Sequence, residues 1–256
     1  MFRITSAVLA GLLGLWSFST AAEAEGITGD VGAGVSYQPR EPTGSRYQTT
    51  AVPYFDLDWG NVSLSTDDGL TWSALNSNGF SAGPYINYVP GRTANGALAG
   101  LRDVSSMAEV GGFIQYAPAE FWRVYAQMGQ AIGGGHQQSG VLGKLGGELG
   151  YPLGGGIIGS SGLTAHFADA RQNQTYFGVS DNEAATSTFR AYNASAGFQN
   201  LTLTQSFAFP LSGNWSLLTS ASWTRLVGTA ANSSIVRQTG EVNQGQVQTA
   251  ISYKFE

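Results

Sequence analysis

Hydrophobic and polar residues alternate one by one along much of this chain, most clearly at its C-terminal end. Val247, Thr249, Ile251, Tyr253 and Phe255 share one face of this segment, and the residues between them, from Gln246 to Lys254, share the other. Successive side chains of a β-strand point to opposite faces, so the segment predicts a strand with one apolar and one polar face. A last strand of this kind, ending in aromatic residues, is typical of a transmembrane β-barrel.

The same alternation recurs in segments of about ten residues after residue 26, for example at 27–38, 141–151, 157–167, 201–209 and 215–223. Short turns at 117–120, 152–156 and 210–214 alternate with longer loops at 39–46, 91–105, 133–140, 169–192 and 228–244. Short turns lie on the periplasmic side of bacterial barrels and long loops lie outside the cell. No helical periodicity stands out in this part of the chain.

The strand count comes to eleven, whereas a single-chain bacterial barrel needs an even number. The uncertain regions are 61–74, where Asp67-Asp68-Gly69 is a turn or a bulge, and 174–180, which is a loop or a further strand. We therefore predict an all-β, antiparallel transmembrane β-barrel of twelve strands, with ten as the alternative.

Composition supports a membrane barrel. Only 11% of the 256 residues are charged, against about 25% in soluble domains. The absence of cysteine excludes disulfides and thiolate chemistry, and the net charge of −5 argues against binding to nucleic acid.

The first 24 residues have the pattern of a cleaved secretory signal. Arg3 precedes an apolar stretch from Ile4 to Phe18, and Ala22-Glu23-Ala24 is a small-x-small cleavage site. We expect residues 1–24 to be removed and residues 25–256 to form one barrel domain in the outer membrane of a Gram-negative bacterium, with lipid as its surroundings.

Charged residues on the polar faces of the strands should line the lumen, because charge is costly on the lipid side. The predicted lumen charges are Asp30, Glu109, Arg123, Lys144 and Glu148, together with Asp56, Asp58 and Lys254. Four residues along a strand span about 13 Å, so Lys144 and Glu148 must pair with other strands. Trp and Tyr residues near strand ends predict interfacial girdles.

Several ordered segments resemble the MipA/OmpV family of MltA-interacting outer-membrane proteins. They are Gly83-Pro84-Tyr85 through Gly91-Arg92, the glycine-rich run from Ile132 to His136, the element from Tyr176 to Ser180, and the segments 214–217 and 225–236. The resemblance covers essentially the whole mature chain. It implies an outer-membrane barrel, and a scaffold between a murein-degrading lytic transglycosylase and a murein-synthesising penicillin-binding protein.

Catalysis has little support in the sequence. His136 and His166 have serines and Asp169 nearby, but no G-x-S-x-G nucleophile elbow surrounds either histidine. Asp67-Asp68-Gly69 is too sparse in oxygen ligands for calcium and suits a turn. We expect no catalytic residue, no cofactor and no metal.

Two functions therefore stay open. The first is a non-enzymatic scaffold or interaction protein of the cell envelope, and the alternative is a porin-like channel for small solutes. Within the longest loop, Tyr176, Phe177, Gly178, Val179 and Ser180 form a possible plug or partner site. The scaffold predicts a filled lumen and the channel predicts an open one.

Overall fold

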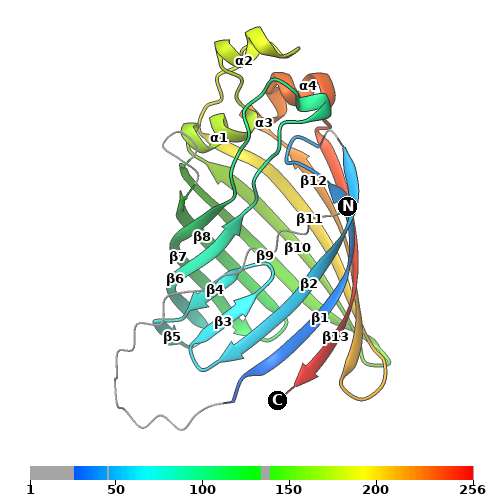
Figure 1. The fold of residues 1–256 in the computed structure, drawn as a ribbon. Helices are drawn as coiled ribbons and strands as arrows, with labels where there is room; N and C mark the ends of the chain where they lie inside the picture. The colour runs from blue at the N-terminus through cyan, green and yellow to red at the C-terminus, as the bar shows by residue number, and fades with distance from the viewer. Residues whose placement is uncertain (1–25, 45, 134–138, 256) are drawn as a thin grey trace.

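The computed structural model describes residues 26–44, 46–133 and 139–255, so the predicted signal segment and His136 lie outside the described residues. The alternating segments form antiparallel strands (Figure 1). Their bounds are β1 Thr28–Pro39, β2 Tyr47–Trp59, β3 Val62–Ser65, β4 Gly69–Trp72, β5 Leu75–Ser77, β6 Phe80–Val89, β7 Met107–Ala119, β8 Trp122–Ile132, β9 Val141–Gly154, β10 Ile157–Ala168, β11 Gly197–Pro210, β12 Trp215–Leu226 and β13 Asn243–Phe255.

The sheet closes on itself and confirms the prediction of twelve strands. Strands adjacent in sequence pair with each other except β4 and β5, which both pair with β6, and β1 pairs with β13. β4 and β5 are two parts of one bulged strand, since both pair with β6. A Cβ on Gly83 would lie 1.8 Å from the Trp72 carbonyl oxygen, so the bulge needs glycine there. The uncertain Asp67-Asp68-Gly69 lies at the turn between β3 and β4, as turn chemistry predicted.

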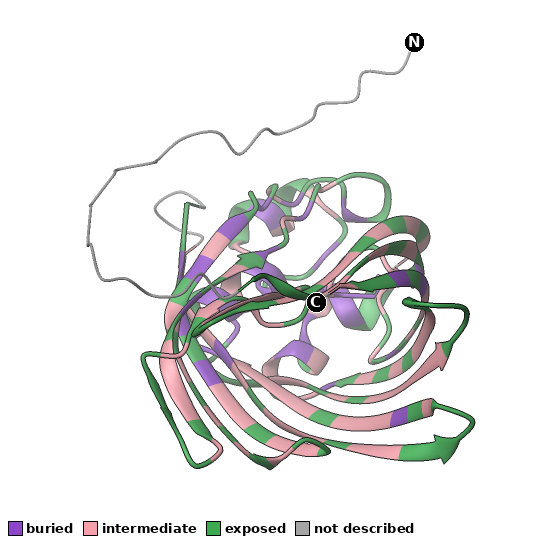
Figure 2. Cartoon of the chain, turned by 90° about the horizontal axis from the view of Figure 1, so that it is seen from below, coloured by how far each residue is buried: buried purple, intermediate pink, exposed green. Residues whose placement is uncertain are grey.

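Burial alternates along the strands as the sequence pattern requires. On β1, Val31, Val35 and Tyr37 are exposed on the outside, whereas Ser36 between them is buried. Seen along the barrel axis, exposed and partly buried positions alternate along the strands (Figure 2). The outer wall therefore presents an apolar band and the inner wall a polar lining.

The two ends of the barrel differ. Short turns and the C-terminal end of β13 lie at one end, here called the turn end (Figure 1). The opposite loop end carries the 3-10 helix η1 Gly96–Leu98 and the helices α1 Ala170–Phe177, α2 Asp181–Thr186, α3 Gly228–Asn232 and α4 Ser234–Thr239. None of the helices in the described ranges is long and apolar enough to cross a membrane.

The loops at this end contain the apolar core of the molecule. One cluster joins Tyr176 and Phe177 to Val104, Leu226 and Val236. A second cluster joins Val179 to Leu98, Leu101, Phe189 and Ile235. The sequence alternative of a strand at 174–180 is wrong, because α1 runs through Phe177 and buries its side chain.

Leu203 tests the assignment of lipid-facing and lumen-facing positions. Its side chain is 53% exposed on the outer wall, whereas Thr204 next to it points inward. We expect Leu203→Arg to lower the free energy of unfolding in phospholipid vesicles by about 2–4 kcal/mol, because a charge then faces hydrocarbon. Denaturant titration of the folded barrel measures this. Thr204→Arg is the matched control and should cost clearly less, and equal losses would contradict the assignment.

Candidate functional site

A network of ion pairs inside the lumen joins the turn between β3 and β4 to β8 and β9. The Asp68 carboxylate lies 2.8 Å from Arg123 Nη1 and 2.8 Å from Lys144 Nζ, and Arg123 Nε lies 2.8 Å from a Glu148 oxygen. Lys144 Nζ also donates to the Asp67 carbonyl at 3.0 Å. We call Asp68, Arg123, Lys144 and Glu148 the latch. Three predicted lumen charges thus meet here, and each finds a partner on another strand.

The topology explains why this contact must cross the lumen. Arg123 on β8 and Glu148 on β9 are register partners. Lys144 lies on the same face of β9, four residues before Glu148. Asp68 lies at the tip of the β3–β4 hairpin, which is separated from β8 by β6 and β7 in the sheet. The tip therefore leans inward to reach the opposite charges. Sequence reasoning identified the turn but missed the role of Asp68, because the turn residues alone do not show which way the tip leans.

A small residue lets a large one fill the lumen beside the latch. Tyr125 extends over Gly146 on the neighbouring strand and its hydroxyl lies 2.8 Å from Thr164 Oγ1. A Cβ on Gly146 would lie 2.7 Å from that hydroxyl. The Arg123 guanidinium lies 4.8 Å from the centre of the Tyr125 ring, a distance at which a cation is attracted to the ring face.

The remaining predicted lumen charges lie apart from the latch. The Glu109 carboxylate accepts a hydrogen bond from the Tyr85 hydroxyl. Asp30 has Asp56 as its register neighbour on one side and Lys254 on the other. These side chains make the inner wall polar without joining the ion-pair network.

A polar cavity of about 200 Å³ lies beside the latch, and Asp68 and Arg123 form part of its lining. We call it the vestibule. Its lining is mainly hydroxyl, amide and carboxylate groups, and Asp68 forms part of its boundary. The lining comprises Asp56, Asp58, Ser63, Ser65, Asp68, Thr71, Ser73, Ser81, Phe113, Gln115, Arg123, Tyr125 and Gln127.

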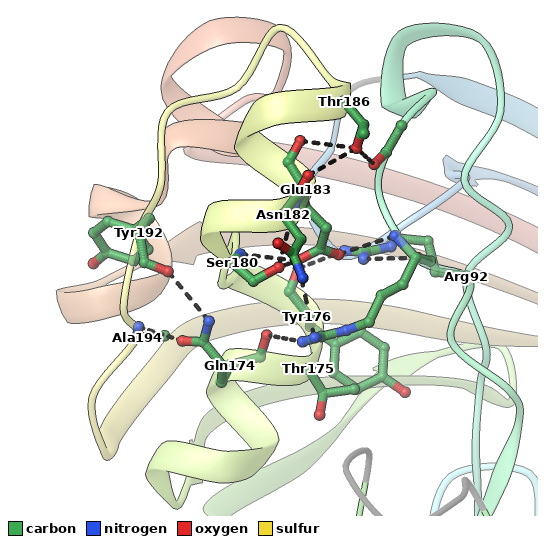
Figure 3. A network of polar contacts seen from close by, with 12 residues as sticks. Arg92, Gln174, Thr175, Tyr176, Ser180, Asn182, Glu183, Thr186, Tyr192 and Ala194 are labelled. Carbon is green, nitrogen blue, oxygen red and sulfur yellow. Dashed lines mark hydrogen bonds and ion pairs between the residues drawn. The ribbon is translucent and has the colours of Figure 1, made fainter.

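The loop end is covered by a cap formed by η1, α1–α4 and the loops that join them, and the segment from Tyr176 to Ser180 lies at its centre. Arg92 Nη1 donates to the Tyr176 carbonyl at 2.6 Å, and Ser233 Oγ donates to the Phe177 carbonyl at 2.6 Å. Burial raises the pKa of Tyr176 to about 12, so its hydroxyl stays protonated and donates to the Pro90 carbonyl. Figure 3 shows how Arg92 and Gln174 connect this segment to neighbouring loops.

Glu183 fixes the next helix of the cap. Ser180 caps α2, and Glu183 accepts hydrogen bonds from the backbone N–H groups of Ser180 at 2.8 Å and Arg102 at 2.9 Å. Burial alone would raise the pKa of Glu183. The hydrogen bonds together lower this pKa by more than burial raises it, so the pKa lies below its usual range. This capping box has a sequence signature, a serine followed three residues later by a glutamate, and that signature could have predicted the start of α2.

His166 and Asp169, two of the residues weighed for catalysis, have structural partners. His166 Nδ1 lies 2.9 Å from Asn200 Oδ1 on the adjacent strand. Asp169 instead caps α1 by accepting from the Gln172 N–H, and it also accepts from the Val141 N–H. Among the described residues, no group of three or more His, Cys, Asp or Glu side chains could hold a metal ion.

A closed antiparallel barrel with an apolar outer wall, a polar lining, and turns and loops segregated to opposite ends is an outer-membrane barrel of a Gram-negative bacterium. The model of the protein family described as "MltA-interacting protein MipA" matches residues 31–255 of this chain. The chain belongs to this family, as the sequence motifs suggested. The turn end accordingly faces the periplasm and the loop end the exterior.

Individual relatives match over a shorter stretch. The MltA-interacting protein of Escherichia coli (strain K12) is 33% identical over 40% of this chain and 39% of its own length. Outer membrane protein Omp26La of Vibrio anguillarum is 36% identical over 39% of this chain and 36% of its own length. The chain therefore matches about two fifths of the length of these curated relatives.

Solved structures similar to this chain include other outer-membrane proteins. The channel DcaP of Acinetobacter baumannii is 11% identical, with a TM-score of 0.39, over 94% of this chain and all of its own. OprG of Pseudomonas aeruginosa is 14% identical, with a TM-score of 0.26, over 91% of this chain and 97% of its own.

The latch should contribute measurably to stability. Asp68→Asn keeps the side-chain volume but leaves Arg123 and Lys144 without their shared carboxylate, so we expect the free energy of unfolding to fall by about 3–5 kcal/mol. A double-mutant cycle with Lys144→Met should give a coupling of about 0.5–3 kcal/mol. Asp58→Asn is the control, because the carboxylate of Asp58 accepts from Ser63 and forms no ion pair among the described contacts. Additive effects of the two latch substitutions would argue against the ion pair.

Glu183 should make the cap sensitive to acid. A lowered folded-state pKa means that its stabilising contribution is complete above the unfolded value of about 4.5 and is lost as pH falls through the folded value. We expect backbone hydrogen exchange in residues 180–186 to accelerate in acid, and Glu183→Gln to remove most of this dependence. Asp181→Asn, at an exposed acid of the same helix, should keep it. Identical acid responses in wild type and the Glu183→Gln variant would contradict this role.

Proposed function

We propose that this protein is a non-enzymatic scaffold of the cell envelope, which holds a lytic transglycosylase and a penicillin-binding protein beside the outer membrane. One observation carries this proposal: the lumen is crossed by the latch and covered outside by the cap. A barrel filled in this way suits an anchor better than a conduit. The name of the E. coli relative, MltA-interacting protein, supports an interaction role.

The surface that would meet periplasmic enzymes is formed by the short turns. Phe121 and Leu211 lie in two of the turns, Leu153 lies in the last residues of β9 before a third, and the three are 58%, 56% and 54% exposed. Exposed apolar groups at the rim of a barrel suit contact with a partner protein, since apolar anchors dominate the binding energy of interfaces. We infer that these side chains are the first contacts of a docked enzyme.

A channel for small solutes is the second candidate, and the vestibule favours it. Its hydroxyl-rich and carboxylate-rich lining suits hydrated solutes. A solute could pass only if the latch opened, since Asp68 lies both at the boundary of the vestibule and in the ion-pair network. This function therefore requires a second state in which the hairpin tip has moved away from Arg123.

The scaffold is tested by crosslinking in cells followed by mass spectrometry of the purified protein. We expect lytic transglycosylases and penicillin-binding proteins to be enriched over an unrelated barrel. Replacing Phe121, Leu153 and Leu211 together by Ser should reduce that enrichment at least several-fold, because the apolar contacts are lost. The control replaces three exposed residues of the outer loops, Asp181, Arg190 and Arg237, by Ser and should leave the enrichment unchanged.

Planar-bilayer conductance separates the two candidates. The scaffold predicts no ion current through the wild-type barrel. Steady conductance, combined with crosslinks only to abundant envelope proteins, would replace the scaffold by the channel.

A further inference from the structure

Part of the barrel wall has no hydrogen-bonded strand. β2 pairs with β1 along its whole length but with β3 only through residues 56–59. β6 pairs with β7 throughout but with β4 only at Tyr85 and Ile86. Residues 47–54 of β2 and 87–89 of β6 therefore face each other without a strand between them. We call these two unpaired edges the seam, which lies above β3 and β4 in Figure 1.

The seam has a floor and a roof. Its floor is the tip of the β3–β4 hairpin, held inward by the latch. Its roof is the contact of Arg46 with Asn95, where the guanidinium donates to the side-chain oxygen at 3.0 Å. Three strand spacings separate β2 from β6 at the floor, which corresponds to about 14 Å. The seam lies toward the loop end and therefore in the outer half of the membrane.

Several backbone N–H groups along the two edges either donate to a side-chain oxygen or are absent because the residue is proline. Thr66 Oγ1 accepts from the Phe55 N–H at 3.0 Å, and Asn87 Oδ1 accepts from the Tyr88 N–H at 2.8 Å. Alternate residues of an edge strand point their N–H groups the same way, so position 53 of β2 faces the seam like Phe55. This position is proline, which has no N–H.

This capping distinguishes between possible occupants. An added β-strand would need the donor that Pro53 lacks and the Phe55 and Tyr88 donors that are already capped. A water-filled slot would not need capped edges, because water satisfies backbone groups. Hydrocarbon does need them, since an unpaired backbone group in lipid costs several kcal/mol. The caps lie on the deeper part of the seam, whereas the edge around Tyr47 and Thr49 lies near the outer membrane surface.

The side chains around the seam suit an amphiphile. Tyr88 and Ile86 are 67% and 49% exposed on the outer wall beside it. Tyr54 and Asn87 point inward and offer polar groups. Arg40 and Arg46 lie above it in the β1–β2 loop, where a guanidinium can bind a phosphate.

We propose that the seam is a lateral site for an outer-leaflet amphiphile with acyl chains and a phosphorylated, anionic headgroup. An acyl chain lies between β2 and β6, above the hairpin tip, and the headgroup lies at Arg40 and Arg46. Access is sideways from the membrane, because the cap covers the barrel axis on this side.

Photo-crosslinking from an inward-facing position tests the site. Val52 points into the lumen behind the seam, and Ser222 points into the lumen behind the continuous wall of β11, β12 and β13. p-Benzoylphenylalanine at position 52, activated in living cells, should give an adduct with phosphorylated glycolipid or phospholipid, detected by mass spectrometry. The same group at position 222 should give at least several-fold less.

Two results would overturn the proposal. Equal yields at the two positions would mean that lipid does not enter through the seam. A protein–protein adduct of twice the chain mass from position 52 would mean that a second copy covers it. Replacing Arg40 and Arg46 by Ala should lower the lipid adduct several-fold, whereas Ala at Arg190 and Arg237 should not, and an unchanged yield after the first pair would overturn the headgroup site. Heat-modifiable mobility in gels verifies that each variant folds.

Discussion

The closure of the β-sheet is the constraint on which the rest of this structure depends. In hydrocarbon, backbone N–H and C=O groups must find partners within the protein, and a closed sheet is the solution open to strands. Here the short strands β3 and β4 connect β2 to β6 and so complete the ring. They have four residues each, and β4 pairs with β6 at only two positions. A hairpin of this length completes the ring near the periplasm but does not reach the outer surface.

The short hairpin explains the two unusual features of the barrel. Because its tip ends partway along the wall, the tip is free to lean inward, and Asp68 can reach Arg123 and Lys144 past β6 and β7. The same shortness leaves β2 and β6 unpaired above it. The latch and the seam therefore both follow from the short length of this hairpin, and Pro53 and the caps at Phe55 and Tyr88 adapt the edges to it.

The parts predictable from sequence were those governed by local periodicity. The two-residue alternation identified the long strands and their lipid-facing positions, and the parity rule corrected the count to twelve. The helices of the cap were missed because five to eight residues carry little periodic signal and gain their stability from tertiary packing. Tyr176 and Phe177 fit a strand equally well by local pattern, and the caps at Asp169 and Ser180 favour helices on either side of them. The inward lean of Asp68 depends on strands far apart in sequence, which no local pattern reports.

The hairpin tip also separates two compartments. Asp68 borders the vestibule inside the lumen, and the same tip forms the floor of the seam, which lies toward the outer leaflet. The Asp68 carboxylate is shared by Arg123 and Lys144, so loss of either ion pair weakens the attachment of the hairpin tip to the opposite strands. The conventional apolar core lies instead in the cap, around Tyr176, Phe177 and Val179, and does not include the tip. The cap thus covers the outer end of the barrel, whereas the hairpin tip inside the lumen is held mainly by ion pairs. A movement that connects the vestibule to the seam must therefore break the ion pairs of the latch.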